Sequence, residues 1–213
     1  LRIENPLTGF RTVSLYHPDG EFEISNVPFR QGRVHLHASA AGYAANLVEA
    51  ILDETTQSAF VEIPLGSGGE LSGHVRDFNG RAVSGATVSI LPFKGPLAVT
   101  DAQGEFRFNH LEPSTRYRPC ASHAEYAPFW GDALQLEEGA SITDYEIILS
   151  RGGEIIGGVL DQAGNPVARA AVEIEDDNRD FVVQPITDAE GMYSQGKVPP
   201  GAYRVSVDSL GYE

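Results

Sequence analysis

The sequence predicts an all-β fold, built as tandem seven-stranded antiparallel β-sandwiches, on three observations. Short segments recur along the chain at a spacing of about 85 residues, which is typical of repeated structural units. Within each repeat, apolar and polar residues alternate as they do in half-buried strands. Turn-forming glycines, aspartates and prolines recur every 8–12 residues or so, as in a sandwich. With 213 residues, the chain is long enough for about two to three small domains.

The repeats are easiest to see at two motifs. Gly69–Asp77 returns as Gly153–Asp161, and Thr100–Phe106 returns as Thr187–Tyr193. A further partial copy of the second motif lies upstream, at Pro18–Phe22. Each repeat therefore begins at the glycine that opens the first motif. This phase predicts three domains, which comprise residues 1–68, 69–152 and 153–213.

The first and last of these domains are expected to be incomplete. When the repeats are aligned, residues 1–68 lack the opening strand and residues 153–213 lack the closing strands. An incomplete sandwich leaves apolar strand edges without a partner. We expect the missing strands to lie in other parts of a longer parent chain. Alternatively, a second copy of the chain supplies them.

The middle repeat shows the expected elements most completely. Its strands are predicted around the following segments: Leu71–Val75, Ala86–Ile90, Phe106–Phe108, Tyr117–Ala121 and Ile142–Leu149. A turn is expected at Asp77–Gly80 and a loop at Pro92–Pro96. Pro119 has no amide hydrogen to donate and therefore suggests an edge strand.

One segment has helical spacing. In Ala44–Asp53, apolar residues recur at helical intervals, but the matching segment of the middle repeat contains Pro128 and Gly131. Because these two residues disfavour a helix, we expect a loop or a strand in both places.

The combined motifs resemble those of the carboxypeptidase regulatory-like domain family. The resemblance rests on Gly73–Val88, on Thr100–Phe108, and on Pro199–Val207 with Gly211-Tyr212, and it extends over nearly the whole chain. It implies a transthyretin-like sandwich, which is related to the immunoglobulin-like and carbohydrate-binding-like folds. The middle repeat departs from the pattern where Glu125 replaces the glycine that precedes the family's tyrosine.

Charge and composition argue against several functions. The net charge of −15 would repel phosphate backbones and anionic lipid surfaces, so nucleic acid is not an expected partner. No apolar run is long enough for a membrane span, and we expect no membrane insertion. Cys120 is the only cysteine, which rules out an intrachain disulfide. The acidity is explained by solubility, with divalent-cation binding as the alternative.

An aromatic cluster is the first candidate ligand site. Tyr126, Phe129 and Trp130 lie close together, with His123 and Asp132 beside them. Aromatic faces flanked by polar groups can stack against sugar rings, so polysaccharide is a candidate ligand. The alternative is that these side chains fill the core or pack between domains. Tyr126 in particular matches Tyr43 and Tyr212 in the other repeats.

An acidic loop is the second candidate site. Asp176, Asp177 and Asp180 could supply oxygen ligands to calcium, the one cofactor considered, in a loop without an evident turn motif. A solvated acidic loop is the alternative. The remaining aspartates of this kind precede glycines in equivalent turns, where turn capping accounts for them; they are Asp19, Asp101, Asp161 and Asp188.

Two histidines form a third candidate. His35 and His37 share one face of the strand expected at Arg33–Ala38, a spacing that can hold zinc. No third histidine or cysteine lies near them in sequence, so solvated side chains are the favoured interpretation.

No catalytic motif is recognisable in the sequence, and we expect no enzymatic activity. The expected function is that of a structural spacer or interaction module in a larger, secreted or cell-surface repeat protein. Its partners would be other domains of the parent chain or other protein chains. Short glycine linkers at Gly66–Gly69 and Ser150–Gly153 predict semi-rigid connections. The alternatives are a carbohydrate-binding module that uses Trp130, and a filament in which neighbouring chains complete each other's sandwiches.

Overall fold

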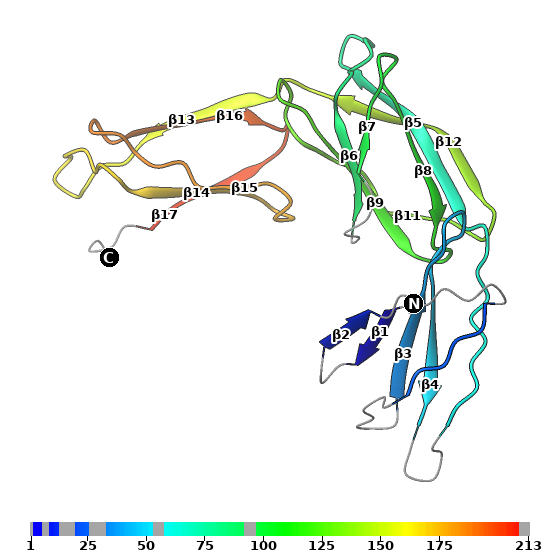
Figure 1. Cartoon of the computed structure of the whole chain (residues 1–213). Coiled ribbons are helices and arrows are strands. Elements are labelled where there is room, and N and C mark those ends of the chain that lie inside the picture. Colours follow the sequence, from blue (N-terminus) through cyan, green and yellow to red (C-terminus); the bar gives the residue numbers. More distant parts are fainter. Residues whose placement is uncertain are drawn as a thin grey trace. The chain divides into compact units, whose positions relative to one another are not determined.

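The chain is all-β throughout the residues that the computed structural model describes, which are 2–5, 9–12, 20–25, 33–52, 58–91 and 97–208. No helix occurs in these ranges, and so none that could cross a membrane. The strands are β1 (Arg2–Asn5), β2 (Gly9–Thr12), β3 (Arg33–Ala38), β4 (Asn46–Ile51), β5 (Gly69–Asp77), β6 (Thr87–Leu91), β7 (Ala98–Val99), β8 (Glu105–Leu111), β9 (Arg116–Ser122), β10 (Phe129–Trp130), β11 (Leu134–Gln135), β12 (Ser141–Leu149), β13 (Gly153–Gly158), β14 (Ala171–Asp176), β15 (Val182–Val183), β16 (Met192–Val198) and β17 (Tyr203–Asp208) (Figure 1).

Contacts between residues divide the chain into two compact units. The first comprises Leu1–Ser72, Arg107–Arg116 and Leu134–Thr143, and the second comprises the remaining segments up to Glu213. The middle repeat contributes to both units. The domain boundaries predicted from the repeats, before residues 69 and 153, stay predictions.

In the first unit, four strands form an antiparallel sheet in the order β2-β1-β3-β4. β3 has the bounds expected from the sequence. β4 lies in the segment with helical spacing, which is therefore a strand, one of the two expected outcomes. Val34, Leu36 and Ala50 are buried at the centre of a small core. Val61 and Ile63 pack against this core, but Phe60, which precedes Val61, is 92% exposed.

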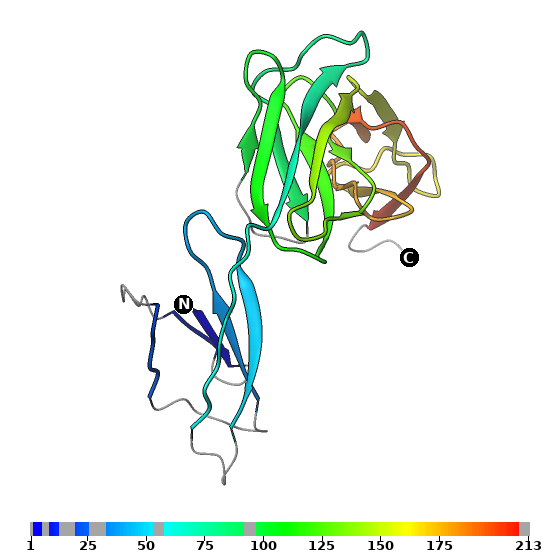
Figure 2. The same ribbon diagram turned by 90° about the vertical axis from the view of Figure 1, so that its right-hand side faces the viewer.

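Strands β5 to β12 form a two-layered sandwich. One sheet has the order β12-β5-β8, and the other has β10-β9-β6-β7, with β11 paired to β9 (Figures 1 and 2). Every second residue of β5 is buried, as the alternation in its sequence predicts. The fully buried side chains of this region come from both sheets and include Leu71, Val75, Val88, Ile90, Ile147 and Leu149. The loop predicted at Pro92–Pro96 lies outside the described residues.

The prediction of an edge strand at Pro119 is wrong. β9 lies between β6 and β10, and Pro119 is aligned with Ile90 of β6. The Pro119 carbonyl accepts a hydrogen bond from the Gly131 amide, at 2.8 Å. In an antiparallel pair, the nitrogen and carbonyl of one residue face the same neighbour. The missing donor therefore faces β10, a strand of two residues, and no long ladder is interrupted.

The C-terminal strands form a smaller sandwich, with one sheet of β13-β16 and another in the order β15-β14-β17 (yellow to red in Figure 1). Val172 and Ile174 of β14 are fully buried. β5 has hydrogen-bonded neighbours on both sides, whereas its counterpart β13 pairs only with β16 among the described residues. Accordingly, Leu71 of β5 is fully buried but the equivalent Ile155 of β13 is only partly buried. The prediction that this repeat lacks its closing strands stays a prediction.

Four aspartates cap tight turns in the same way. The Oδ1 atom of each accepts hydrogen bonds from the backbone amides two and four residues further along the chain, at 2.8–3.0 Å; these residues are Asp77, Asp101, Asp161 and Asp188. The turn-capping interpretation is therefore confirmed for the predicted positions that the structure describes. Asp19, the remaining predicted position, lies outside the described residues.

Candidate functional site

The glycine linker that follows the first repeat, called a joint below, is tightly packed around Gly68. It lies within the first unit. Gly68 adopts a left-handed backbone conformation, with φ of +68°. A β-carbon here would lie 2.5 Å from the Leu111 carbonyl oxygen and 2.6 Å from the Ala44 β-carbon. The Ala44 amide donates a hydrogen bond to the Gly66 carbonyl, at 3.0 Å. Only glycine satisfies both the conformation and the close approach.

The joint that follows the middle repeat has the same construction, within the second unit. Gly152 has φ of +73°, and a β-carbon on it would lie 2.7 Å from the Val198 carbonyl oxygen and 2.9 Å from the Ala127 β-carbon. The Ala127 amide donates to the Ser150 carbonyl, at 2.9 Å. The contacting residues of the two joints are equivalent in the repeats. The chain therefore builds one local linker geometry twice.

Polar contacts fix each joint further. In the first, Oε1 of Glu138 accepts hydrogen bonds from the Gly68 amide at 3.1 Å and from the Ser67 hydroxyl at 3.3 Å. In the second, the Lys197 ammonium donates to the carbonyl of Ala124. His110 and Lys197, which occupy equivalent positions beside the two joints, both have a positive φ despite their side chains. The same strained backbone conformation therefore occurs beside both joints.

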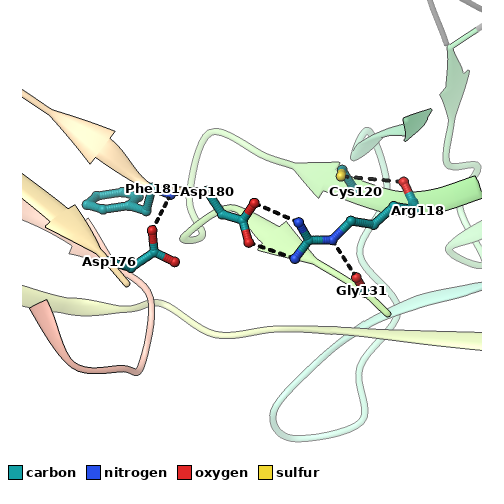
Figure 3. A network of polar contacts seen from close by, with 6 residues as sticks. All are labelled: Arg118, Cys120, Gly131, Asp176, Asp180 and Phe181. Carbon is teal, nitrogen blue, oxygen red and sulfur yellow. Dashed lines mark hydrogen bonds and ion pairs between the residues drawn. The ribbon is translucent and has the colours of Figure 1, made fainter. Parts of the chain in front are cut away.

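A two-pronged ion pair links β9 to the loop between β14 and β15 (Figure 3). The Arg118 guanidinium donates to both carboxylate oxygens of Asp180, at 2.6 and 2.7 Å, and its Nε donates to the Gly131 carbonyl at 2.8 Å. The hydrogen bonds to Asp180 raise the pKa of Arg118 above its usual value. The side chains are 33% and 18% exposed, so water screens the pair only in part. Arg118 and Asp180 belong to segments predicted as separate repeats.

A row of aromatic rings, like the ion pair, connects side chains of the middle repeat to side chains of the third repeat. The Trp130 and Phe181 rings meet edge to face, with centroids 6.4 Å apart, and Phe181 meets Tyr203 in the same way at 5.7 Å. The Tyr203 hydroxyl donates to the Pro199 carbonyl at 2.6 Å, and burial raises its pKa. Edge-to-face pairs of this kind stabilise a contact beyond the area that they bury.

Most of the predicted site residues line one hollow of about 510 Å³. Phe129 and Trp130 line it together with Asp176, Asp177 and Asp180, so the structure brings together two candidates that the sequence treated separately. Tyr126 is not part of the lining and instead contacts the His123 ring, with centroids 5.3 Å apart. Arg118, Phe181 and Tyr203 also line the hollow, and none of them was singled out as a ligand-binding residue from the sequence.

The acidic loop has a turn motif, contrary to the expectation that it had none. The Arg179 amide donates to the Asp176 carbonyl at 3.0 Å, and the Phe181 amide donates to the Asp176 Oδ1 atom at 3.0 Å (Figure 3). Asp176 thus caps the hairpin, and Asp180 pairs with Arg118. No group of three potential metal-ligating side chains occurs within the described residues. Calcium binding at this loop stays a prediction that nothing in the fold requires.

The two histidines of β3 each pair with a carboxylate. The Nε2 atom of His35 lies 3.4 Å from Oε2 of Glu49, and the Nε2 atom of His37 lies 3.5 Å from Oε1 of Glu112. Val34 and Leu36 on the opposite face are buried. His35 and His37 therefore lie apart from the core and make separate contacts with carboxylates.

Nothing in the sequence indicated the Arg118–Asp180 pair. The position of Arg118 is occupied by His35 in the first repeat and again by an arginine, Arg204, in the third, but this recurrence does not indicate Asp180 as a partner. The joint glycines could have been recognised, because Gly68 and Gly152 recur at the same phase just before each repeat.

Comparison with solved structures finds bacterial proteins, pilins among them, at low identity. The Bacillus anthracis TIE protein is 18% identical, with a TM-score of 0.35 over 77% of this chain and 31% of its own. A streptococcal ancillary pilin is 12% identical, with a TM-score of 0.37 over 85% and 67% of the two chains. BcpA, the major pilin subunit of Bacillus cereus, is 10% identical, with a TM-score of 0.26 over 65% and 87%. The chain thus spans about a third of the TIE protein, and at these values the likenesses do not extend to function.

The family comparison is more specific. No curated protein sequence matches the chain. The carboxypeptidase regulatory-like domain matches it twice in tandem, over residues 70–150 and 154–213. The fold and this match identify β-sandwich modules in tandem, as the motifs and repeat spacing predicted. Because the two matches cover well over half of its residues, the chain belongs to the carboxypeptidase regulatory-like domain family.

Proposed function

We propose that this chain is a spacer segment of a larger secreted or cell-surface protein, and that its task is to hold successive sandwiches in a fixed local arrangement. The observation that carries the proposal is the repeated joint. Gly68 and Gly152 have nearly the same φ and approach equivalent alanine and carbonyl groups. A flexible linker would need neither a left-handed glycine in contact with its neighbours nor the same contacts repeated at both joints.

Two further features support this function at the second joint. The Arg118–Asp180 pair is bidentate and partly shielded from water, and the row of rings from Trp130 to Tyr203 packs beside it. Both link segments that lie on either side of Gly152 in sequence. An arrangement held by several independent contacts moves less than one held by the linker alone.

The proposal is tested by measuring how far the segments on either side of Gly152 move. Spin labels are placed at two exposed positions, Gln103→Cys and Glu190→Cys, in a Cys120→Ala background, and distances are measured by pulsed electron paramagnetic resonance. We expect one narrow distance distribution. A broad distribution in the chain with an intact joint would contradict the proposed function.

A matched pair of glycine variants then tests whether the close packing at Gly152 causes the narrow distance distribution. Gly152→Ala places a β-carbon against Val198 and Ala127, and is expected to broaden the distribution. Gly164 has a similar φ, +84°, but nothing lies within 4 Å of an added β-carbon. Gly164→Ala therefore introduces the same kind of backbone strain without the contact, and is expected to leave the distribution narrow.

A further inference from the structure

The hollow beside Trp130 carries negative charge that no cation in the described residues neutralises. Three aspartates line it, but Asp180 is paired with Arg118. Neither Asp176 nor Asp177 forms an ion pair within the described part of the chain, and the Asp177 side chain is exposed. The hollow therefore presents two carboxylates to whatever occupies it.

Aromatic rings stand next to these carboxylates. Trp130, Phe181 and Tyr203 line the same hollow, and successive rings are inclined by 80° and 76°. Phe181 is only 6% exposed, whereas Trp130 and Tyr203 are partly exposed, so these two rings are the ones that a ligand in the hollow can reach. The face of an aromatic ring attracts a cation, and more strongly when a carboxylate lies nearby.

We propose that this hollow binds a lysine or arginine side chain from an extended basic segment of a partner protein. The aromatic rings would contact the aliphatic part of that side chain and its charged head, while Asp176 and Asp177 would provide the opposite charge. The net charge of −15 on the whole chain would attract such a segment from a distance. A phosphate or an acidic polysaccharide would be repelled, and a neutral sugar would leave the two carboxylates without a counter-charge.

The volume of the hollow agrees with this occupant. About 510 Å³ lies within the range of about 300–1,000 Å³ that is typical of small-ligand sites. Proline side chains from two loops, Pro128 and Pro199, complete the apolar part of the lining. The site does not depend on the spacer function, since a basic segment could bind whether or not the joint is rigid.

The full chain offers a direct readout, because Trp130 is its only tryptophan. Tryptophan fluorescence is followed while tetra-arginine or tetra-lysine peptide is added, with tetra-glutamate, maltohexaose and calcium chloride as separate arms. We expect a saturable change with the basic peptides, which weakens as salt is raised, and no change in the other arms.

A pair of charge-matched variants distinguishes the hollow from the charge of the whole protein. Asp177→Asn removes one carboxylate from the hollow, and we expect it to weaken peptide binding about fivefold. Glu190→Gln removes one charge at an exposed position outside the lining, and we expect a change of less than about twofold. Both variants keep the side-chain shape, and circular dichroism checks that both remain folded.

Three outcomes would overturn the proposal. The first is the absence of any fluorescence response to the basic peptides. The second is equal weakening by Asp177→Asn and Glu190→Gln, which would indicate attraction to the whole surface. The third is a response to maltohexaose or to calcium without one to the peptides, which would assign the hollow to a sugar or a metal ion.

Discussion

At the residue scale, two buried threonines organise equivalent turns. The Thr100 hydroxyl donates to the Val83 carbonyl at 2.7 Å and accepts from the Ala86 amide at 2.9 Å. Thr187 makes the same pair of bonds with Val167 and Ala170, at 2.7 and 2.8 Å. One hydroxyl thus satisfies a backbone donor and a backbone acceptor that burial would otherwise leave without partners. This explains why threonine opens the repeated Thr-Asp motif.

Thr100→Val is therefore expected to lower the free energy of unfolding by about 1–3 kcal/mol, because the shape is kept while both backbone groups lose their partner. Thr100→Ser keeps the hydroxyl and loses only a methyl group, so it should cost about 1 kcal/mol or less. Urea unfolding followed by circular dichroism compares the two. If serine proved as costly as valine, packing of the methyl group rather than hydrogen bonding would explain the motif.

Two equivalent glycines should differ in their tolerance of substitution. A β-carbon on Gly73 would overlap the backbone carbonyl of Tyr145 on β12. On Gly157, which occupies the same position in the next repeat, the three nearest atoms all belong to the Tyr193 side chain, whose hydroxyl lies 2.5 Å away. A side chain can rotate away, whereas a hydrogen-bonded strand cannot.

We therefore expect Gly73→Ala to destabilise by about 3 kcal/mol or more, and Gly157→Ala by about 1 kcal/mol or less. Thermal unfolding of the two variants in parallel measures the difference. Equal losses would show that β12 can move away from β5, and that the close approach of these strands is not needed.

Hydrogen bonds at the turn aspartates predict a local dependence on pH. The side-chain amide of Asn165 donates to Asp161 at 3.0 Å, and this bond together with the backbone bond from Asn165 lowers the pKa of Asp161 below its ordinary value of 3.8. Because the pKa of Asp161 is lower in the folded state than in the unfolded chain, these bonds stabilise the fold fully at pH values above the ordinary pKa. The stabilisation is lost as the pH falls through the folded-state pKa.

Asn165→Ala is expected to raise the pKa of Asp161 towards 3.8, since the largest contribution to its lowering is removed. The pKa of Asp77 is also lowered, mainly by the backbone bond from Arg81, and should not change in this variant. Carbon-13 NMR titration of both carboxyl groups measures these values in one sample. An unchanged Asp161 in Asn165→Ala would contradict the assignment.

At the scale of elements, strands could be predicted from the sequence because alternation records which face of a strand is buried. β3 matches its expected bounds, and the predicted strands of the middle repeat fall within β5, β6, β8, β9 and β12, except that β6 begins one residue after Ala86. The alternation does not show which strands lie on either side of a given strand in the sheet. Pro119 shows this, because its missing donor was compatible both with an edge strand and with a place beside the two-residue β10.

The candidate site could be predicted only in part, for a similar reason. Trp130 and Asp180 were each singled out, but they lie in different repeats, and no local pattern indicates that they line one hollow. Arg118 could not be found at all, since an arginine at an outward position of a strand usually faces solvent. Contacts of this kind depend on how segments that are distant in sequence pack together.

The Arg118–Asp180 pair should be coupled more strongly than a pair at the surface. Its side chains are 33% and 18% exposed, whereas Arg107 and Glu70 are 63% and 29% exposed although they also approach to 2.6 Å. We expect double-mutant cycles with Arg→Gln and acid→amide substitutions to give about 1–2 kcal/mol for the first pair and about 0–1 kcal/mol for the second. Equal coupling would show that Asp180 is as well solvated as Glu70.

At the scale of the whole molecule, the repeats and the pattern of contacts suggest different boundaries. The repeats separate residues 69–152 from their neighbours, whereas the contacts divide this segment between two compact units. All strands of the sheets β12-β5-β8 and β10-β9-β6-β7 nevertheless lie within residues 69–152. So do buried side chains from both of these sheets, such as Leu71, Ile90 and Ile147.

The middle repeat should therefore fold when it is expressed alone, as residues 69–152. A domain of this size with two complete sheets is expected to unfold in one cooperative transition. Residues 153–213 alone provide the contrast, because β13 pairs on one side only among the described residues, and Ile156 and Leu160 are 62% and 63% exposed. We expect this second fragment to aggregate or to show no cooperative transition in urea. If residues 69–152 were unfolded as well, the compact units defined by contacts, rather than the repeats, would be the units that fold.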